Sequence, residues 1–245
     1  MMVYLSERKF NLFIKELKSK KGILKWSKKF HKGTPFDIIY VLLRHFLKKE
    51  GHNKMVCVGS VEILLQTWNM AWYRSLKPRK KQRLTKEILY LLRKHYKNIN
   101  VRRSISSLNQ RDKKKISLLF NEFRKKLGPV GTSKALHLLN PKFFPIWDNS
   151  IADHYHKYLH KCNPQKHHPG KAMSCDCYFQ FCLDSKEILK AIPRRMRNEL
   201  VKRDMKNLRT RANFPRFEYT LPRILDKCNY AGITERLSKQ KKSKK

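Results

Sequence analysis

Apolar residues along this chain recur at the three- and four-residue spacing of one helix face. The first such stripe consists of Phe10, Phe13, Ile14 and Leu17. Residues at this spacing lie above one another on an α-helix, so they can be buried together. No convincing run alternates apolar and polar residues as a half-buried strand would. The pattern predicts an all-α protein.

Capping residues and helix breakers divide the rest of the chain into further predicted helices. They are expected at about residues 36–47, 60–73, 84–96, 112–127, 133–139, 148–159, 184–191, 193–208 and 219–229. The stretch 163–174 contains Pro, Gly and His and is expected to be a loop. The lysine-rich stretch 238–245 is expected to be a disordered, solvated tail.

Composition adds a strong positive charge to this helical pattern. The 58 Lys and Arg residues outnumber the 18 Asp and Glu residues, so the formal net charge is +40. A field of this sign attracts polyanions, which makes nucleic acid the expected partner and an anionic membrane surface the alternative. With 245 residues, 40% of them hydrophobic, the chain can bury a core, and it is not a disordered basic tail.

Neither a membrane span nor a secretion signal is expected. The longest apolar runs, such as residues 38–43, are far too short to cross a bilayer. Charged residues at Glu7, Arg8 and Lys9 interrupt any apolar core of a signal peptide. We therefore expect an intracellular protein, in the cytoplasm or on the nucleoid.

A turn rich in Gly and Pro separates two of the predicted helices. It reads Leu-Gly-Pro-Val-Gly-Thr-Ser-Lys over residues 127–134. Glycines let such a turn approach a phosphate closely, and the free amides that open the second helix can bind that phosphate. The predicted DNA-binding residues are Gly128, Val130, Gly131, Thr132, Ser133 and Lys134. Such a contact reads no base sequence, and the same motif also occurs as an ordinary turn between helices.

A single carboxylate follows this turn, at the start of another predicted helix. The sequence Phe-Pro-Ile-Trp over residues 144–147 leads to Asp148, and Asn149-Ser150 opens the helix. Amides at a helix N-terminus would hold this carboxylate ionised. Asp148 is a catalytic candidate because it lies shortly after the turn in a strongly basic chain. The alternative is an ordinary helix cap.

The stretch from Leu127 to Ile151 resembles the core of the helix-hairpin-helix DNA glycosylase superfamily, the group of endonuclease III and 8-oxoguanine DNA glycosylase. The family pattern is a Leu-Pro-Gly-Val-Gly hairpin, a helix and a Pro-x-Asp turn. Here the hairpin has Gly and Pro exchanged, and the turn is Pro145-Ile146-Trp147-Asp148. The segment 133–141 looks most like an 8-oxoguanine-glycosylase-like branch. The similarity covers about a tenth of the chain.

The resemblance implies two helical subdomains that flank a DNA-binding cleft. One would hold residues 35–140, and the other residues 141–237 together with an N-terminal helix in residues 1–34. The implied activity is base excision by a monomer acting on double-stranded DNA with base damage. Asp148 would stabilise the cationic sugar that forms as the glycosidic bond breaks.

Lys134 is the second catalytic candidate. Bifunctional members of the family, which also act as lyases at the abasic site, carry a Schiff-base lysine directly after the hairpin Gly-x. An ungapped comparison puts Ser133 at that position and Lys134 one residue later, a rotation of about 100° on a helix. The exchanged Gly-Pro order could shift the turn by that one residue. Lys134 is therefore either an imine-forming nucleophile or a phosphate-binding residue.

A base pocket would need aromatic walls on which an extruded base can stack. The candidates for this pocket are Trp68, Asn69, Trp72 and Trp147. Core packing is the alternative for Trp68 and Trp72, because residues four apart share a helix face.

A region rich in Cys and His raises the question of a metal. Its cysteines are Cys162, Cys175, Cys177 and Cys182. Their spacing fits neither a common zinc module nor the iron–sulfur loop of some glycosylases. We therefore expect thiols packed in a core, with no metal and no cofactor, and the alternative is a zinc or iron–sulfur site.

The leading hypothesis is a DNA repair glycosylase, with lyase activity if Lys134 is a nucleophile. The alternative is a non-catalytic DNA-binding protein that retains the hairpin. A nuclease is disfavoured, because the chain lacks the clustered carboxylates that would hold magnesium.

Overall fold

The computed structural model describes residues 6–33, 37–50, 53–99, 103–159, 174–193, 197–202 and 220–234. Over these residues the chain forms helices and turns and no strand, which confirms the predicted all-α class. The principal α-helices are α1 (Glu7–Leu17), α2 (Lys20–Gly33), α3 (Asp37–Lys49), α4 (Lys54–Trp68), α5 (Met70–Ser75), α6 (Pro78–Ile99), α7 (Lys113–Leu139), α8 (Asn149–Tyr158), α9 (Cys175–Lys190) and α11 (Leu221–Asn229). Two short 3₁₀-helices are η1 (Ile105–Ser107) and η2 (Gln110–Asp112), and η4 (Tyr230–Thr234) is a short π-helix. None of the described helices combines the length and apolar character that a bilayer span requires.

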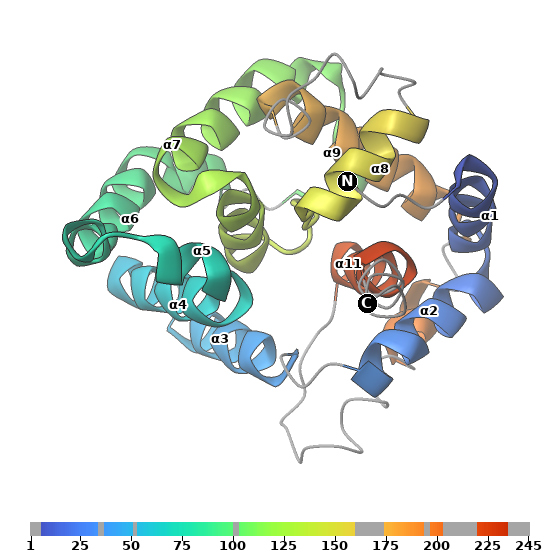
Figure 1. The fold of residues 1–245 in the computed structure, drawn as a ribbon, viewed down its shortest axis with the longest axis horizontal. Helices are drawn as coiled ribbons and strands as arrows, with labels where there is room; N and C mark the ends of the chain where they lie inside the picture. Colours follow the sequence, from blue (N-terminus) through green and yellow to red (C-terminus); the bar gives the residue numbers. More distant parts are fainter. Residues whose placement is uncertain are drawn as a thin grey trace, which may run out of the picture.

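Helix α7 contacts two groups of helices. The first group is α3, α4 and α6, with α5 packed on α4. The second is reached through α9, which packs on α8 and α11, while α11 packs on α2. Figure 1 shows α3 to α6 on one side of the view and α1, α2 and α8 on the other. Buried apolar side chains from both groups form one continuous core.

The stripe predicted in the first helix is buried. Its four residues form the buried face of α1, and the ring of Phe10 lies edge-on against Tyr155 of α8, with centroids 5.6 Å apart. The N-terminal segment holds two helices, however, where one was expected. Gly22, in the first turn of α2, permits a close approach to the end of α1, because a Cβ there would collide with the carbonyl oxygen of Glu16. The second helix, α2, was not predicted because its many lysines interrupt its apolar stripe.

Helix α4 begins at Lys54 rather than near residue 60. The side-chain oxygen of Asn53 accepts hydrogen bonds from the amides of Met55 (2.9 Å) and Val56 (3.3 Å), and so caps the helix. The helix predicted to run on to residue 73 is divided at Asn69, whose φ of −124° and ψ of 35° leave helical geometry. The chain then continues as α5.

Helix α9 begins at Cys175, although a helix was predicted only from residue 184. The hydroxyl of Ser174 caps it by accepting a hydrogen bond from the amide of Cys177, at 3.2 Å. The start of α9 was not predicted because the residues before it favour a loop. The rest of that predicted loop, residues 163–173, and the predicted tail at 238–245 lie outside the described residues.

Candidate active site

Helix α7 turns sharply at Gly128. This residue has φ 69° and ψ 167°, a left-handed backbone that glycine adopts without a Cβ clash. Pro129 follows, at the first position of a new helical segment, where its missing N–H costs nothing. The hydroxyl of Thr132 donates to the carbonyl oxygen of Gly128 at 2.7 Å. The second helical segment thus begins directly after Gly128, not at Ser133 as predicted.

The predicted DNA-binding residues differ in how far they are exposed to solvent. Gly128, Val130 and Lys134 are partly exposed, whereas Gly131, Thr132 and Ser133 are buried. Gly131 packs on α4, since a Cβ there would lie 3.1 Å from the side chain of Leu65. Fewer residues of the turn are therefore available to contact DNA than the sequence predicts.

Ser133 connects this turn to the segment that precedes Asp148. Its hydroxyl lies 3.0 Å from the carbonyl oxygens of both Val130 and Trp147. The amide of Trp147 also lies 3.4 Å from the Ser133 oxygen. These bonds hold the start of α8 against the second segment of α7, so Lys134 and Asp148 enter the same region.

Asp148 is the N-cap of α8, as predicted. Its Oδ1 accepts a hydrogen bond from the amide of Ile151 at 2.8 Å, and its Oδ2 accepts one from the hydroxyl of Thr234 at 2.7 Å. The carboxylate is partly buried and fixed through both oxygens. Sequence reasoning missed Thr234, because it lies far along the chain and no local pattern marks it.

Lys134 faces the same pocket as Asp148. Its ammonium group donates to the carbonyl oxygen of Trp68. Burial lowers the pKa of Lys134 to about 8; the negative charge of Asp148 opposes this shift, and the positive charge of Arg223 adds to it. A lysine with such a pKa is partly neutral near physiological pH, so its nitrogen can act as a nucleophile.

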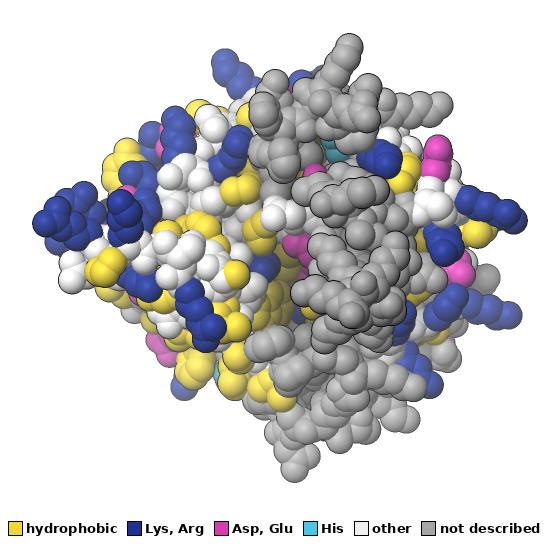
Figure 2. Space-filling model, viewed as in Figure 1, with side chains coloured by type: hydrophobic (Ala, Val, Ile, Leu, Met, Phe, Trp, Pro, Cys, Tyr) yellow, Lys and Arg dark blue, Asp and Glu magenta, His cyan; other side chains and the backbone are white. Residues whose placement is uncertain are grey.

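The pocket that contains both side chains has a volume of about 250 Å³. Trp68 and Phe30 provide aromatic surface in its lining, and Arg223 provides a second cation. Figure 2 shows hydrophobic and acidic side chains near the centre of one face, with most Lys and Arg side chains toward its edges. A small pocket with convergent charged groups and apolar walls is typical of a ligand site.

Arg223 is a pocket residue that no sequence motif marks. It is fully buried in α11, where it forms an ion pair with Asp226. Its guanidinium carbon lies 4.5 Å from the ring centroid of Trp68 and 4.9 Å from that of Tyr40. Tyr40 and Trp68 stack at 5.4 Å with an interplanar angle of 24°. The aromatic wall of the pocket is thus held by a buried cation.

The four predicted base-pocket residues lie in three places. Trp68 lines the pocket, while Asn69 and Trp72 lie near the α7 turn. A Cβ added at Gly131 would contact Asn69, and one added at Gly128 would contact Trp72. Trp147 is only 1% exposed and is not among the lining residues; it packs in the core against Tyr178, at 5.1 Å between centroids. Trp147 thus lies in the core, whereas the next residue, Asp148, lines the pocket.

The described residues contain no group of three or more His, Cys, Asp or Glu side chains that could hold a metal ion. Cys182 is buried, whereas Cys175 and Cys177 are partly buried. The sulfur of Cys177 lies 3.7 Å from Nδ1 of His156. Cys162 lies outside the described residues.

Comparison with protein-family models, with curated proteins and with solved structures finds no match for this chain. Its function is therefore argued from its own residues.

Proposed function

We propose that this protein is a DNA glycosylase of the helix-hairpin-helix kind, with lyase activity, which excises a damaged base from duplex DNA. The observation that carries the proposal is the pocket shared by Asp148 and Lys134, next to the sharp turn at Gly128. An acid and a partly neutral amine in one small pocket are the two groups that base excision with strand cleavage requires.

Asp148 stabilises positive charge on the deoxyribose. As the bond between C1′ and the base breaks, the base leaves with the electron pair and the sugar becomes cationic. A carboxylate already oriented by the Ile151 amide and the Thr234 hydroxyl needs no rearrangement to stabilise that charge. The apolar walls of the pocket lower the local dielectric and strengthen this effect.

Lys134 is the nucleophile in the proposed mechanism. Its neutral amine forms a bond to C1′ while the bond to the base breaks, and the proton that the new ammonium loses goes to the departing base. The C1′–O4′ bond then opens as the ring oxygen takes a proton from solvent, which leaves a protonated imine. Loss of the C2′ proton to solvent breaks the C3′–O bond and expels the 3′ phosphate. The low pKa of Lys134 supplies the neutral amine. Its position in the pocket favours this role over a phosphate contact.

The DNA would cross the molecule over the turn at Gly128. In this arrangement α3 to α7 form one subdomain and the remaining helices the other, with the cleft between them. The partly exposed Gly128 and Val130 would approach a phosphate, and the net charge of +40 would strengthen binding to any duplex. The damaged base would enter the pocket beside Trp68 after leaving the stack.

A non-catalytic DNA-binding protein is the second candidate. The two buried hydroxyls at Thr132 and Ser133 favour a structural role for part of the motif. The two candidates differ in one respect, because only the glycosylase needs Asp148 and Lys134 for more than binding.

The test uses duplexes that carry oxidised, alkylated or deaminated bases. We expect the wild type to release base from at least one of them, and borohydride to trap a covalent adduct. Asp148→Asn keeps a good N-cap and should bind DNA but release no base. Lys134→Gln should abolish the trapped adduct.

Two exposed residues provide matched controls. Lys125→Gln removes a lysine from α7, and Asp176→Asn removes a carboxylate from the first turn of α9. Both should leave base release and trapping unchanged. No release from any lesion by the wild type would leave the non-catalytic alternative.

A further inference from the structure

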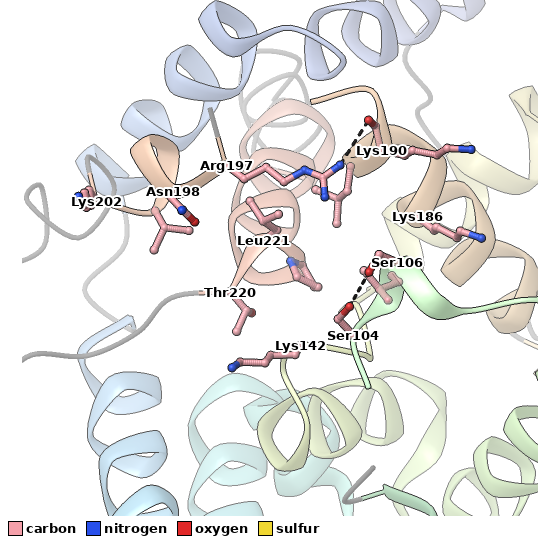
Figure 3. A pocket seen from close by; sticks show the side chains of 14 residues that line it. Ser104, Ser106, Lys142, Lys186, Lys190, Arg197, Asn198, Lys202, Thr220 and Leu221 are labelled. Carbon is pink, nitrogen blue, oxygen red and sulfur yellow. Dashed lines mark hydrogen bonds between the residues drawn. The ribbon is translucent and has the colours of Figure 1, made fainter. Parts of the chain in front are cut away.

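A second cavity, of about 800 Å³, differs in chemistry from the pocket at Asp148 (Figure 3). Its walls come from η1, residue 142, α9, residues 197–202 and the start of α11. Its basic lining residues are Lys142, Lys186, Lys190, Arg197 and Lys202. No acidic residue occurs among the described residues that line it. This combination is typical of a site for an anion.

The two pockets lie at different places on α11 and α7. Thr220 and Leu221, at the start of α11, line this cavity, whereas Arg223 and Asp226 line the other pocket. Residue 142 follows the C-terminal end of α7, about 16 Å of helix from the turn at Gly128. The cavity is therefore a separate site, away from the turn to which the duplex backbone is assigned.

Arg197 has the fixed geometry of an anion-binding residue. Its Nε donates to the carbonyl oxygen of Ile192 at 2.9 Å, and its Nη2 donates to that of Lys190 at 3.5 Å. Within the described part of the chain its Nη1 makes no hydrogen bond, and Arg197 forms no ion pair there. Figure 3 shows its side chain between α9 and α11, extended across the cavity. A guanidinium held in this way loses little entropy when it binds a phosphate.

Two lysines of α9, Lys186 and Lys190, lie beside Arg197 in the lining of the cavity. The ammonium group of Lys186 donates to the carbonyl oxygen of Leu108 at 2.7 Å, a bond that orients the side chain and cancels no charge. Among the described residues neither Lys186 nor Lys190 forms an ion pair with a carboxylate. Lys186, Lys190 and Arg197, which have no ion-pair partner among the described residues, favour a ligand with more than one negative charge in this concave site.

Hydroxyl groups and an apolar wall complete the cavity. Ser104 and Ser106 lie on the side of η1, with their oxygens 2.6 Å apart, and both are exposed (Figure 3). Apolar surface comes from Leu189, Val201 and Leu221. A volume of about 800 Å³ suits a ligand of nucleotide size, with phosphates toward the cations and a nucleoside toward the apolar wall.

We propose that this cavity binds a nucleotide through its phosphate groups, with Arg197 as the central ligand. The nucleotide is either free in solution or the phosphorylated end of a nucleic-acid strand, because the two present the same groups. The proposal does not depend on base excision at Asp148.

The experiment measures binding of ATP to the full chain by calorimetry at about 0.15 M salt, which screens contacts with exposed lysines. We expect saturable binding at one site. Ser106→Glu places a carboxylate in the cavity from an exposed position and leaves every Arg197 contact intact. It should weaken ATP binding roughly tenfold or more, as should Arg197→Gln combined with Lys142→Gln.

Arg93→Gln combined with Lys125→Gln is the matched control, since it removes one arginine and one lysine from exposed positions elsewhere. It should leave ATP affinity within about twofold, the scatter expected for exposed changes. A trinucleotide with a 5′ phosphate identifies the source of the bound phosphate groups. If the trinucleotide binds more tightly than ATP and competes with it, the ligand is a strand end. If the trinucleotide binds more weakly than ATP, the ligand is a free nucleotide. No saturable ATP binding, an equal loss in the control, or full affinity in Ser106→Glu would overturn the proposal. Asp148→Asn should bind ATP as the wild type does, which separates this outcome from a failure of the glycosylase proposal.

Discussion

The hydroxyl of Ser133 lies 3.0 Å from the carbonyl oxygen of Trp147, and this hydrogen bond joins the segment after the Gly128 turn to the segment that ends at Asp148. Ser133 precedes Lys134 and Trp147 precedes Asp148, so one buried bond positions both catalytic candidates. Ser133 stands where the resemblance expects a lysine, and in the structure it is buried and hydrogen-bonded to the backbone.

Ser133→Ala is therefore expected to affect both stability and reactivity. It leaves the buried carbonyl of Trp147 without this donor, which costs about 1–3 kcal/mol in the free energy of unfolding. Urea unfolding measures the loss, and the rate of borohydride trapping should fall as well. A variant with wild-type stability and wild-type trapping would show that the bond does not position the site.

Gly128→Ala and Gly59→Ala should change stability in opposite directions. At Gly128 the positive φ costs a residue with a Cβ roughly 1–2 kcal/mol, and the added atom would lie 3.2 Å from Nε1 of Trp72. Gly59 lies inside α4 with open space around its Cβ position, so alanine there should stabilise by about 0.5–1 kcal/mol. Thermal unfolding of both variants checks the contrast. Equal effects would mean that the turn carries no conformational constraint.

The low pKa of Lys134 predicts how imine formation depends on pH. Below a pKa of about 8 the neutral fraction of the amine rises about tenfold per pH unit, and above it the fraction levels off. The single-turnover trapping rate should follow this curve between pH 6 and 9.5. A rate that falls over the same range would assign Lys134 to phosphate binding instead.

Stability should depend on pH through the same group. The folded-state pKa of Lys134 lies below its ordinary value of 10.5, so the unfolded chain binds more protons between about pH 8 and 10.5. The contribution of Lys134 to the free energy of unfolding therefore rises with pH across this window. Lys134→Met should remove this rise, which urea unfolding of both proteins at several pH values measures. Identical pH slopes in the two proteins would contradict the shift.

Removal of Arg223 should be more damaging than removal of the whole ion pair. Arg223→Met leaves Asp226 buried without its cation, a loss of about 3–5 kcal/mol, whereas Arg223→Met with Asp226→Leu should recover much of it. In Arg223→Met the pKa of Lys134 should also rise, because a nearby positive charge is lost. Unfolding curves and the pH profile of trapping test the two effects. A double variant less stable than the single one would show that the pair stabilises the fold.

Local features of the fold and site followed from the sequence, and long-range features did not. The stripe from Phe10 to Leu17 and the cap at Asp148 depend on neighbouring residues, so spacing predicted both. Thr234 and Arg223 reach the pocket from the far end of the chain, where no motif marks them. Trp147 was predicted to line the pocket because its aromatic character was known and the direction of its side chain was not.

The last described helix and turn supply Arg223, Asp226 and Tyr230 to the lining of the pocket, and Thr234 to Asp148, whereas the other lining residues come earlier in the chain. During translation, Lys134 and Asp148 emerge from the ribosome well before these partners. A nascent chain that has not yet released residues 220–234 from the exit tunnel thus holds an unassembled site. The pocket would be complete only after residues 220–234 have left the tunnel.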